Sequence, residues 1–198
     1  MTEPLAALVT FAVVATASPG GATSLATASG AQFGYLRSLP LIFGIATALA
    51  LLVAVSGTGL AATILAFPVL EFAMKAVGSA YLLWLAFVIL KAGSPAAASV
   101  SDKSPIGFFG GAMLLGVNPK AWAMAVGVAG SFSGISDNPY ALAAVLGSVF
   151  AIAATLSLSM WTVAGSFLAR IIRENWQWHV FNAVMALLLV SSIASFWI

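Results

Sequence analysis

The segment Ser18-Pro19-Gly20-Gly21 interrupts the first long apolar run of the sequence, and Asn118-Pro119-Lys120-Ala121 interrupts the fourth. Proline inside a helix removes one backbone donor and clashes with the preceding turn. Serine and asparagine are favoured N-cap residues, and proline is favoured at the first position of a helix. We therefore predict that Ser18 and Asn118 each end one half-helix and cap the next, so that two helices of the fold are broken.

The composition places these breaks in a lipid bilayer. Of the 198 residues, 62% are apolar and only 6% are charged, whereas about a quarter of the residues in soluble domains are charged. The net charge of +2 comes from few groups, which gives no basic patch for nucleic acid. The sequence contains no cysteine, which excludes disulfides, zinc–thiolate sites and thiol redox relays.

The uncharged runs predict an all-α membrane protein that forms one integral domain over residues 1–198. A bilayer core about 30 Å thick requires about 20 helical residues, and helices satisfy their own backbone groups in lipid. The first run has no positively charged segment before it, so we expect a retained span and not a cleaved signal. The expected spans lie near residues 5–27, 39–65, 69–91, 106–129, 139–166 and 176–197.

Basic residues set the expected orientation. They fall in the connectors after the first, third and fifth spans, at Arg37, Lys91, Lys103, Arg170 and Arg173. Positive connectors remain on the cytoplasmic side. We therefore expect both termini on the extracytoplasmic side.

The two breaks lie 100 residues apart, which suggests an internal repeat. Cutting the chain after the third span gives one repeat at about 5–91 and another at about 106–197, joined by a small-residue connector at 92–105 that we expect to be a flexible hinge. Because each half has three spans, an odd number, the second repeat must enter the membrane inverted.

A helix that restarts inside the membrane exposes free N–H groups and the positive end of its dipole. Such a place suits a carboxylate, while carbonyls released upstream suit an ammonium, so one break can hold both ends of an amino acid. The alternative is an ordinary proline kink packed by glycines, but two breaks at corresponding positions favour a site. The predicted substrate-binding residues are Ser18, Pro19, Gly20, Gly21, Asn118, Pro119 and Lys120.

Three charged residues have two interpretations each. Lys120 lies in an otherwise uncharged run and is either a substrate anchor or proton-linked switch, or a snorkelling lysine. Glu71 and Lys75 are four residues apart and form either a helix-end ion pair or a gate that couples transport to protons.

Other polar and small residues carry weaker predictions. Thr47, Tyr81 and Ser157 are candidates to line a cavity, although hydroxyls in membrane helices often bond their own backbone. We expect His179 to pack at the interface beside tryptophans, and we predict no metal site. Glycines spaced by four residues permit close helix packing or a homodimer, namely Gly30 and Gly34, Gly107 and Gly111, and Gly130 and Gly134.

Three motifs resemble those of the LysE/RhtB family, and the resemblance covers nearly all of the chain. They are Ser18-Pro19-Gly20, Val77-Gly78-Ser79-Ala80-Tyr81-Leu82-Leu83-Trp84-Leu85 and Asn118-Pro119-Lys120-Ala121. The resemblance implies a bacterial inner-membrane exporter of amino acids such as lysine, arginine, threonine, homoserine or leucine. It also implies six spans in two inverted units and exchange of the amino acid for protons.

The chain departs from that family at informative positions. Gly21 stands where many relatives have a second proline, and Ser157 stands near the place where relatives often carry an acid in the fifth span. The second span likewise offers only hydroxyls, including Thr47. These differences favour a neutral amino acid over a cationic one.

We therefore expect a secondary transporter, without cofactor or enzymatic activity, that exports a small neutral amino acid or related metabolite by proton antiport. The alternatives are an exporter of lysine or arginine, an exporter of another small solute, or a membrane scaffold. Intramembrane proteases and metal-ion exporters would need a Gly-x-Ser-Gly turn, paired acids, histidines or thiols that the sequence lacks.

Overall fold

The long apolar runs form helices in the structure, and the two breaks separate pairs of shorter helices. The structure is a computed structural model that describes residues 2–59, 66–94 and 104–197. No strand occurs in these ranges. The helices are α1 (Thr2–Ala17), α2 (Gly21–Phe33), α3 (Tyr35–Gly57), α5 (Pro68–Leu90), α6 (Phe108–Gly116), α7 (Pro119–Ser131), the short η2 (Ser133–Ile135), α8 (Pro139–Ile171) and α9 (Asn175–Trp197).

Four of these helices, α3, α5, α8 and α9, are long and apolar enough to cross a membrane without interruption. The pairs α1/α2 and α6/α7 are bent by 59° and 70° at their breaks. Counting each bent pair as one span gives six spans. The predicted helical class and both interruptions are therefore confirmed.

Some boundaries differ from the prediction. The second long helix begins at Tyr35 and not near 39, because Gly34, with φ +79°, turns the chain directly after α2. It ends at Gly57, and residues 60–65 of the expected span lie outside the described residues. The fifth span continues to Ile171, since an apolar helical face persists past 166. Most of the expected hinge at 92–105 also lies outside the described residues.

The predicted cap at Asn118 is correct. Pro119 is the first residue of α7, and the Ala121 N–H donates to the side-chain oxygen of Asn118 at 3.3 Å. Asparagine followed by proline thus restarts this helix as its local chemistry requires.

The predicted cap at Ser18 is wrong. Its hydroxyl turns back and donates to the Val14 carbonyl of α1 at 2.6 Å, and α2 begins only at Gly21. Gly20 takes the N-cap position, where its N–H donates to the Thr23 hydroxyl at 2.8 Å and its carbonyl accepts from that hydroxyl at 3.0 Å. Ser18 therefore closes the first half-helix, while a threonine inside the second half-helix caps it.

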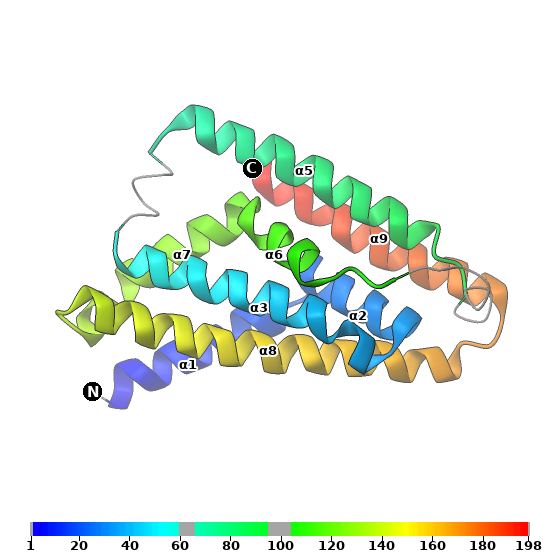
Figure 1. Cartoon of the computed structure of the whole chain (residues 1–198), viewed down its shortest axis with the longest axis horizontal. Coiled ribbons are helices and arrows are strands. Elements are labelled where there is room, and N and C mark those ends of the chain that lie inside the picture. Colours follow the sequence, from blue (N-terminus) through cyan, green and yellow to red (C-terminus); the bar gives the residue numbers. More distant parts are fainter. Residues whose placement is uncertain (1, 60–65, 95–103, 198) are drawn as a thin grey trace.

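Helix α8 runs along the lower edge of the bundle in Figure 1 and contacts α1, α2 and α3. Helix α3 also packs on α6 and α7, while α5 and α9 lie side by side along one flank. Fully buried side chains on α8 include Leu146 and Phe150. The two broken spans are thus held against two unbroken ones.

Glycines allow the closest approaches between helices. A Cβ at Gly30 of α2 would lie 2.0 Å from the Thr162 carbonyl oxygen of α8, and one at Gly165 would lie 2.0 Å from that of Thr27. Helices α3 and α6 meet in the same way at Gly44 and Gly111. Because lipid offers no hydrophobic drive for helix association, such backbone contact stabilises the bundle through close packing.

Gly30→Ala should destabilise the protein, because its methyl group forces α2 and α8 apart. Overpacking of this kind costs about 1–3 kcal/mol, which lowers the melting temperature by about 5 °C. Thermal melting of the detergent-solubilised protein measures the effect. Gly130→Ala is the matched control, since nothing lies within 4 Å of a Cβ there. Equal melting of the two variants would contradict the packing argument.

Candidate functional site

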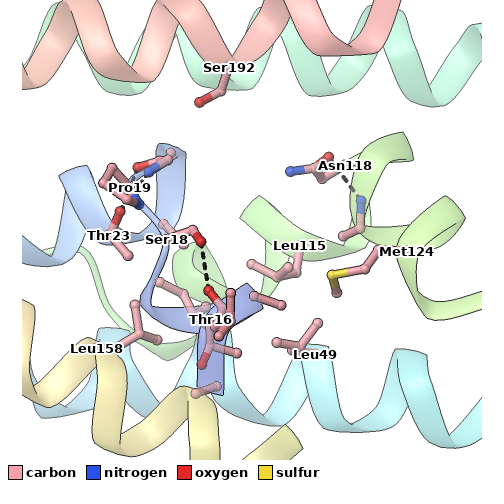
Figure 2. A pocket seen from close by; sticks show the side chains of 18 of the residues that line it. Thr16, Ser18, Pro19, Thr23, Leu49, Leu115, Asn118, Met124, Leu158 and Ser192 are labelled. Atoms are coloured by element: carbon pink, nitrogen blue, oxygen red, sulfur yellow. Dashed lines mark hydrogen bonds between the residues drawn. The ribbon is translucent and has the colours of Figure 1, made fainter. Parts of the chain in front are cut away.

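The two helix breaks face one cavity of about 470 Å³ (Figure 2). Figure 2 shows Pro19 and Asn118 on opposite sides of this cavity, with Ser192 of α9 above them and Leu49 and Leu158 below. The described residues that line it come from seven helices and both breaks: Phe11, Val14, Ala15, Thr16, Ser18, Pro19, Gly20, Gly21, Ala22, Thr23, Ile45, Leu49, Leu115, Asn118, Ala121, Met124, Ala154, Leu158 and Ser192.

Helix α8 supplies the hydrogen bonds that the end of α1 lacks. The Ser157 hydroxyl donates to the Thr16 carbonyl at 2.7 Å, and the Trp161 indole N–H donates to the Ala17 carbonyl at 3.1 Å. Two of the carbonyls that the break releases are therefore already paired with protein, and they are not the ones we expect to bind a ligand.

The Ala15 carbonyl is different. Its helical donor would be the N–H of residue 19, which is proline and has none. Ala15 and Ser18 both line the cavity. This carbonyl and the Ser18 hydroxyl belong to residues that line the cavity, and oxygen atoms of this kind can bind an ammonium group.

The N-terminus of α2 lies on the same cavity. The N–H groups of Gly21, Ala22 and Thr23 belong to the first turn, where a helix offers no internal acceptor. All three residues line the cavity. The positive end of the α2 dipole therefore lies at the cavity, which suits a carboxylate.

The second break satisfies itself locally. The Asn118 N–H donates to the Leu115 carbonyl at 3.1 Å, and the Trp122 indole donates to the Gly116 carbonyl at 2.9 Å. Asn118 lines the cavity, whereas Pro119 is buried and does not. Lys120 lies in the first turn of α7, and its side chain is outside the described residues. The second break thus contributes Asn118 and Ala121 to the cavity.

The described part of the lining is electrically neutral. Among the described residues that line the cavity, none carries a charged side chain. Its polar groups are hydroxyls, the Asn118 amide and the backbone at the first break, while Leu49, Leu115 and Met124 add an apolar surface. This arrangement can hold a zwitterion with an uncharged side chain.

The remaining predicted residues lie elsewhere. Glu71 and Lys75 form an ion pair of 2.8 Å in the first two turns of α5, away from the cavity lining. Thr47 lines a separate groove between α3 and α8. The Tyr81 hydroxyl donates to the Gly110 carbonyl at 2.7 Å and so joins α5 to α6. His179 is exposed, and no cluster of metal-binding side chains occurs in the described ranges.

Several residues that contribute to the site were not predicted from the sequence. Thr23 follows Gly20 by three residues, the spacing of a reciprocal cap, and this signal was available. The roles of Trp161 and Ser192 had no local signal, because each acts on a break that is distant in the sequence.

Comparisons with known proteins identify the family of this chain. Residues 13–196 match the LysE type translocator family, and the chain belongs to that family. The cysteine/O-acetylserine efflux proteins of Salmonella typhimurium, Salmonella choleraesuis and Salmonella paratyphi A are each 29% identical over 189 residues, covering 94% of this chain and 93% of theirs. No solved structure matches the chain. The protein is therefore a multi-pass membrane transporter and not an enzyme.

Ser157→Ala should destabilise the protein, since it leaves the Thr16 carbonyl without its donor inside the membrane. An unsatisfied buried acceptor costs about 1–3 kcal/mol, so we expect the melting temperature to fall by about 3–6 °C. Thr155→Ala is the control, because that hydroxyl bonds only the Ala151 carbonyl of its own helix. If both variants melt alike, the bond from α8 does not hold the break.

Proposed function

We propose that this LysE type translocator exports a small, neutral amino acid or a closely related metabolite from the cytoplasm. One observation carries the proposal: the two helix breaks meet at a single cavity with no charged side chain among its described lining residues. The N–H groups of Gly21, Ala22 and Thr23 bind the carboxylate, and the Ala15 carbonyl and Ser18 hydroxyl bind the ammonium.

The relatives support this class of cargo. Cysteine and O-acetylserine, which appear in the names of the Salmonella proteins, are zwitterions with uncharged side chains. The neutral lining fits such molecules, whereas the side chain of lysine or arginine would be buried without a carboxylate partner at a considerable desolvation cost. A cationic amino acid is therefore the second candidate.

The distribution of charge supports the expected orientation. Basic residues lie in the first turn of α3, just after α5 and at or after the end of α8, namely Arg37, Lys91, Arg170 and Arg173. The acidic residues Glu3 and Asp137 lie in the first turn of α1 and just before α8. Figure 1 shows the start of α3 and the ends of α5 and α8 at one end of the bundle, at the right, and the starts of α1 and α8 at the other. We place the basic end in the cytoplasm of a bacterial cell and both termini outside the inner membrane.

The packing also supports an inverted repeat. An inverted pairing of α1/α2, α3 and α5 with α6/α7, α8 and α9 would match α3 with α8 and α5 with α9, and each of these pairs is in contact. The same pairing would map the contact between α1 and α8 onto the contact between α6 and α3, and both contacts are present. Alternating access then arises when one half rocks against the other about the connector at 92–105.

Counterflow in liposomes tests the cargo. Liposomes that contain the protein and are loaded with unlabelled cysteine or O-acetylserine should accumulate the same labelled solute from outside. Liposomes loaded with lysine should accumulate less than a tenth as much labelled lysine. Gly21→Leu should abolish counterflow, because a Cβ there already lies 3.4 Å from the Ser192 hydroxyl and the longer side chain fills the cavity. Gly127→Leu, with nothing within 4 Å of its Cβ, should transport normally. Absence of counterflow for every amino acid would refute the exporter.

Proton coupling has its own test. We assign the proton to Glu71, whose ion pair with Lys75 lies at the proposed outer end. Acidifying the outer side should accelerate efflux from liposomes several-fold, and Glu71→Gln should remove that acceleration. Glu174→Gln, at the opposite end, should keep it. If acidification has no effect on the wild type, transport is not coupled to protons; if Glu71→Gln responds normally, Glu71 only closes a helix end.

A further inference from the structure

A second cavity, of about 440 Å³, lies near the basic end of the bundle. One face of α2 forms one wall, with Leu25, Ala28, Ser29 and Gln32 at helical spacing. Residues near the end of α5, Phe87 to Ala92, form the opposite wall together with Ser104 and Ile106. This cavity is separate from the one at the helix breaks, since the two share no lining residue.

The two cavities follow one another along α2. Gly21 lines the first, and Leu25, one turn later, lines the second. Between them the side chains are closely packed: Leu25 is 2% exposed and Leu82 of α5 is 3% exposed. Leu82 also lies 3.8 Å from the position of a Cβ on Gly21. A solute at the breaks is therefore separated from the second cavity by a short apolar barrier.

Two side-chain amides, one of them on the lining residue Gln32, form a hydrogen-bonded cluster beside the second cavity. The side-chain amides of Gln32 and Asn182 both donate to the Gly93 carbonyl, at 2.8 and 3.0 Å, and the Gln32 amide also approaches the Asn182 oxygen at 3.4 Å. Asn182 is 1% exposed. Gly93 has φ +69°, a conformation that favours glycine. The cluster joins α2 of the first half, α9 of the second half and the chain that follows α5.

Two cations flank this end. Lys91 lines the cavity, and its ammonium lies 4.3 Å from the centre of the Phe87 ring, another lining residue. The Arg37 guanidinium lies 5.7 Å from the centre of the Phe33 ring, which also lines the cavity. Positive charge at the mouth of a cavity attracts a carboxylate from solution.

We propose that this second cavity is the cytoplasmic entrance of the transport path, and that Gln32, Gly93 and Asn182 form the latch that closes it. The role as an entrance rests on the proposed export function, whereas the latch rests on the hydrogen bonds alone. Loading of cargo requires both amides to leave the Gly93 carbonyl, so that α2 and α9 can separate and the barrier at Leu25 and Leu82 can open.

The natural absence of cysteine allows a direct test. Ala28→Cys places a thiol on the wall of the second cavity, at a position only 3% exposed. In everted membrane vesicles, where the cytoplasmic face is outside, a membrane-impermeant maleimide should label this thiol slowly. Adding Gln32→Met or Asn182→Leu, which cannot donate to Gly93, should accelerate labelling about tenfold.

Two controls make the result specific. Arg173→Cys, at an exposed position just after α8 at the same basic end, should react at one rate with or without the latch substitutions. Gln32→Met serves if Asn182→Leu does not fold, because Gln32 is only partly buried and its loss removes two of the three contacts. The proposal is overturned if the maleimide labels Ala28→Cys no faster in folded latch variants than in the protein with an intact latch. It is also overturned if labelling occurs only in right-side-out vesicles.

The outcome is independent of the proposed cargo. Latch-dependent labelling without counterflow of any amino acid would refute the export function and keep the latch. Normal counterflow with labelling that ignores the latch would refute the latch and keep the exporter.

Discussion

The structure depends on the requirement that backbone groups inside a membrane find hydrogen-bond partners. An unbroken helix satisfies this requirement internally, but Pro19 and Pro119 remove donors within two spans. Partners must then come from elsewhere. Ser157 and Trp161 supply them for the last carbonyls of α1, and other residues of the first break line the cavity. Backbone groups that lack a partner within the protein are the ones proposed to bind a polar solute.

The two breaks meet this requirement in different ways. The second is closed by its own segment, through Asn118 and Trp122. The first relies on α8 for two carbonyls, so its geometry depends on how α1 sits against α8. A movement of one helix relative to the other would change the exposed acceptors at the first break while leaving the second intact. This difference is consistent with a fixed half-site at Asn118 and an adjustable one at Ala15 and Ser18.

Helix α2 contributes both to the proposed cargo site and to the proposed cytoplasmic entrance. Its N-terminus lines the central cavity, its middle lines the second cavity, and Gln32, near its end, contributes to the amide latch. The same helix crosses α8 in backbone contact at Gly30. A rigid element of this kind transmits a change at the basic end to the site at the break, because its packing against α8 tolerates little sliding. In the two proposals, the binding of cargo and the opening of the entrance therefore both depend on this one helix.

The sequence by itself determined the features that are local. Apolar runs predicted the six spans, the two prolines predicted the breaks, and Asn118 predicted its own cap, because each depends on residues within a turn. The Ser18 hydroxyl could either bond to the turn before it or cap the helix after it. Only the structure shows that it donates to the Val14 carbonyl. The donors from α8 and the latch of Gln32, Gly93 and Asn182 were beyond prediction, since they join residues far apart in the chain. Spacing along one helix cannot specify which face of a distant helix will meet it, and that choice is made only when the bundle packs.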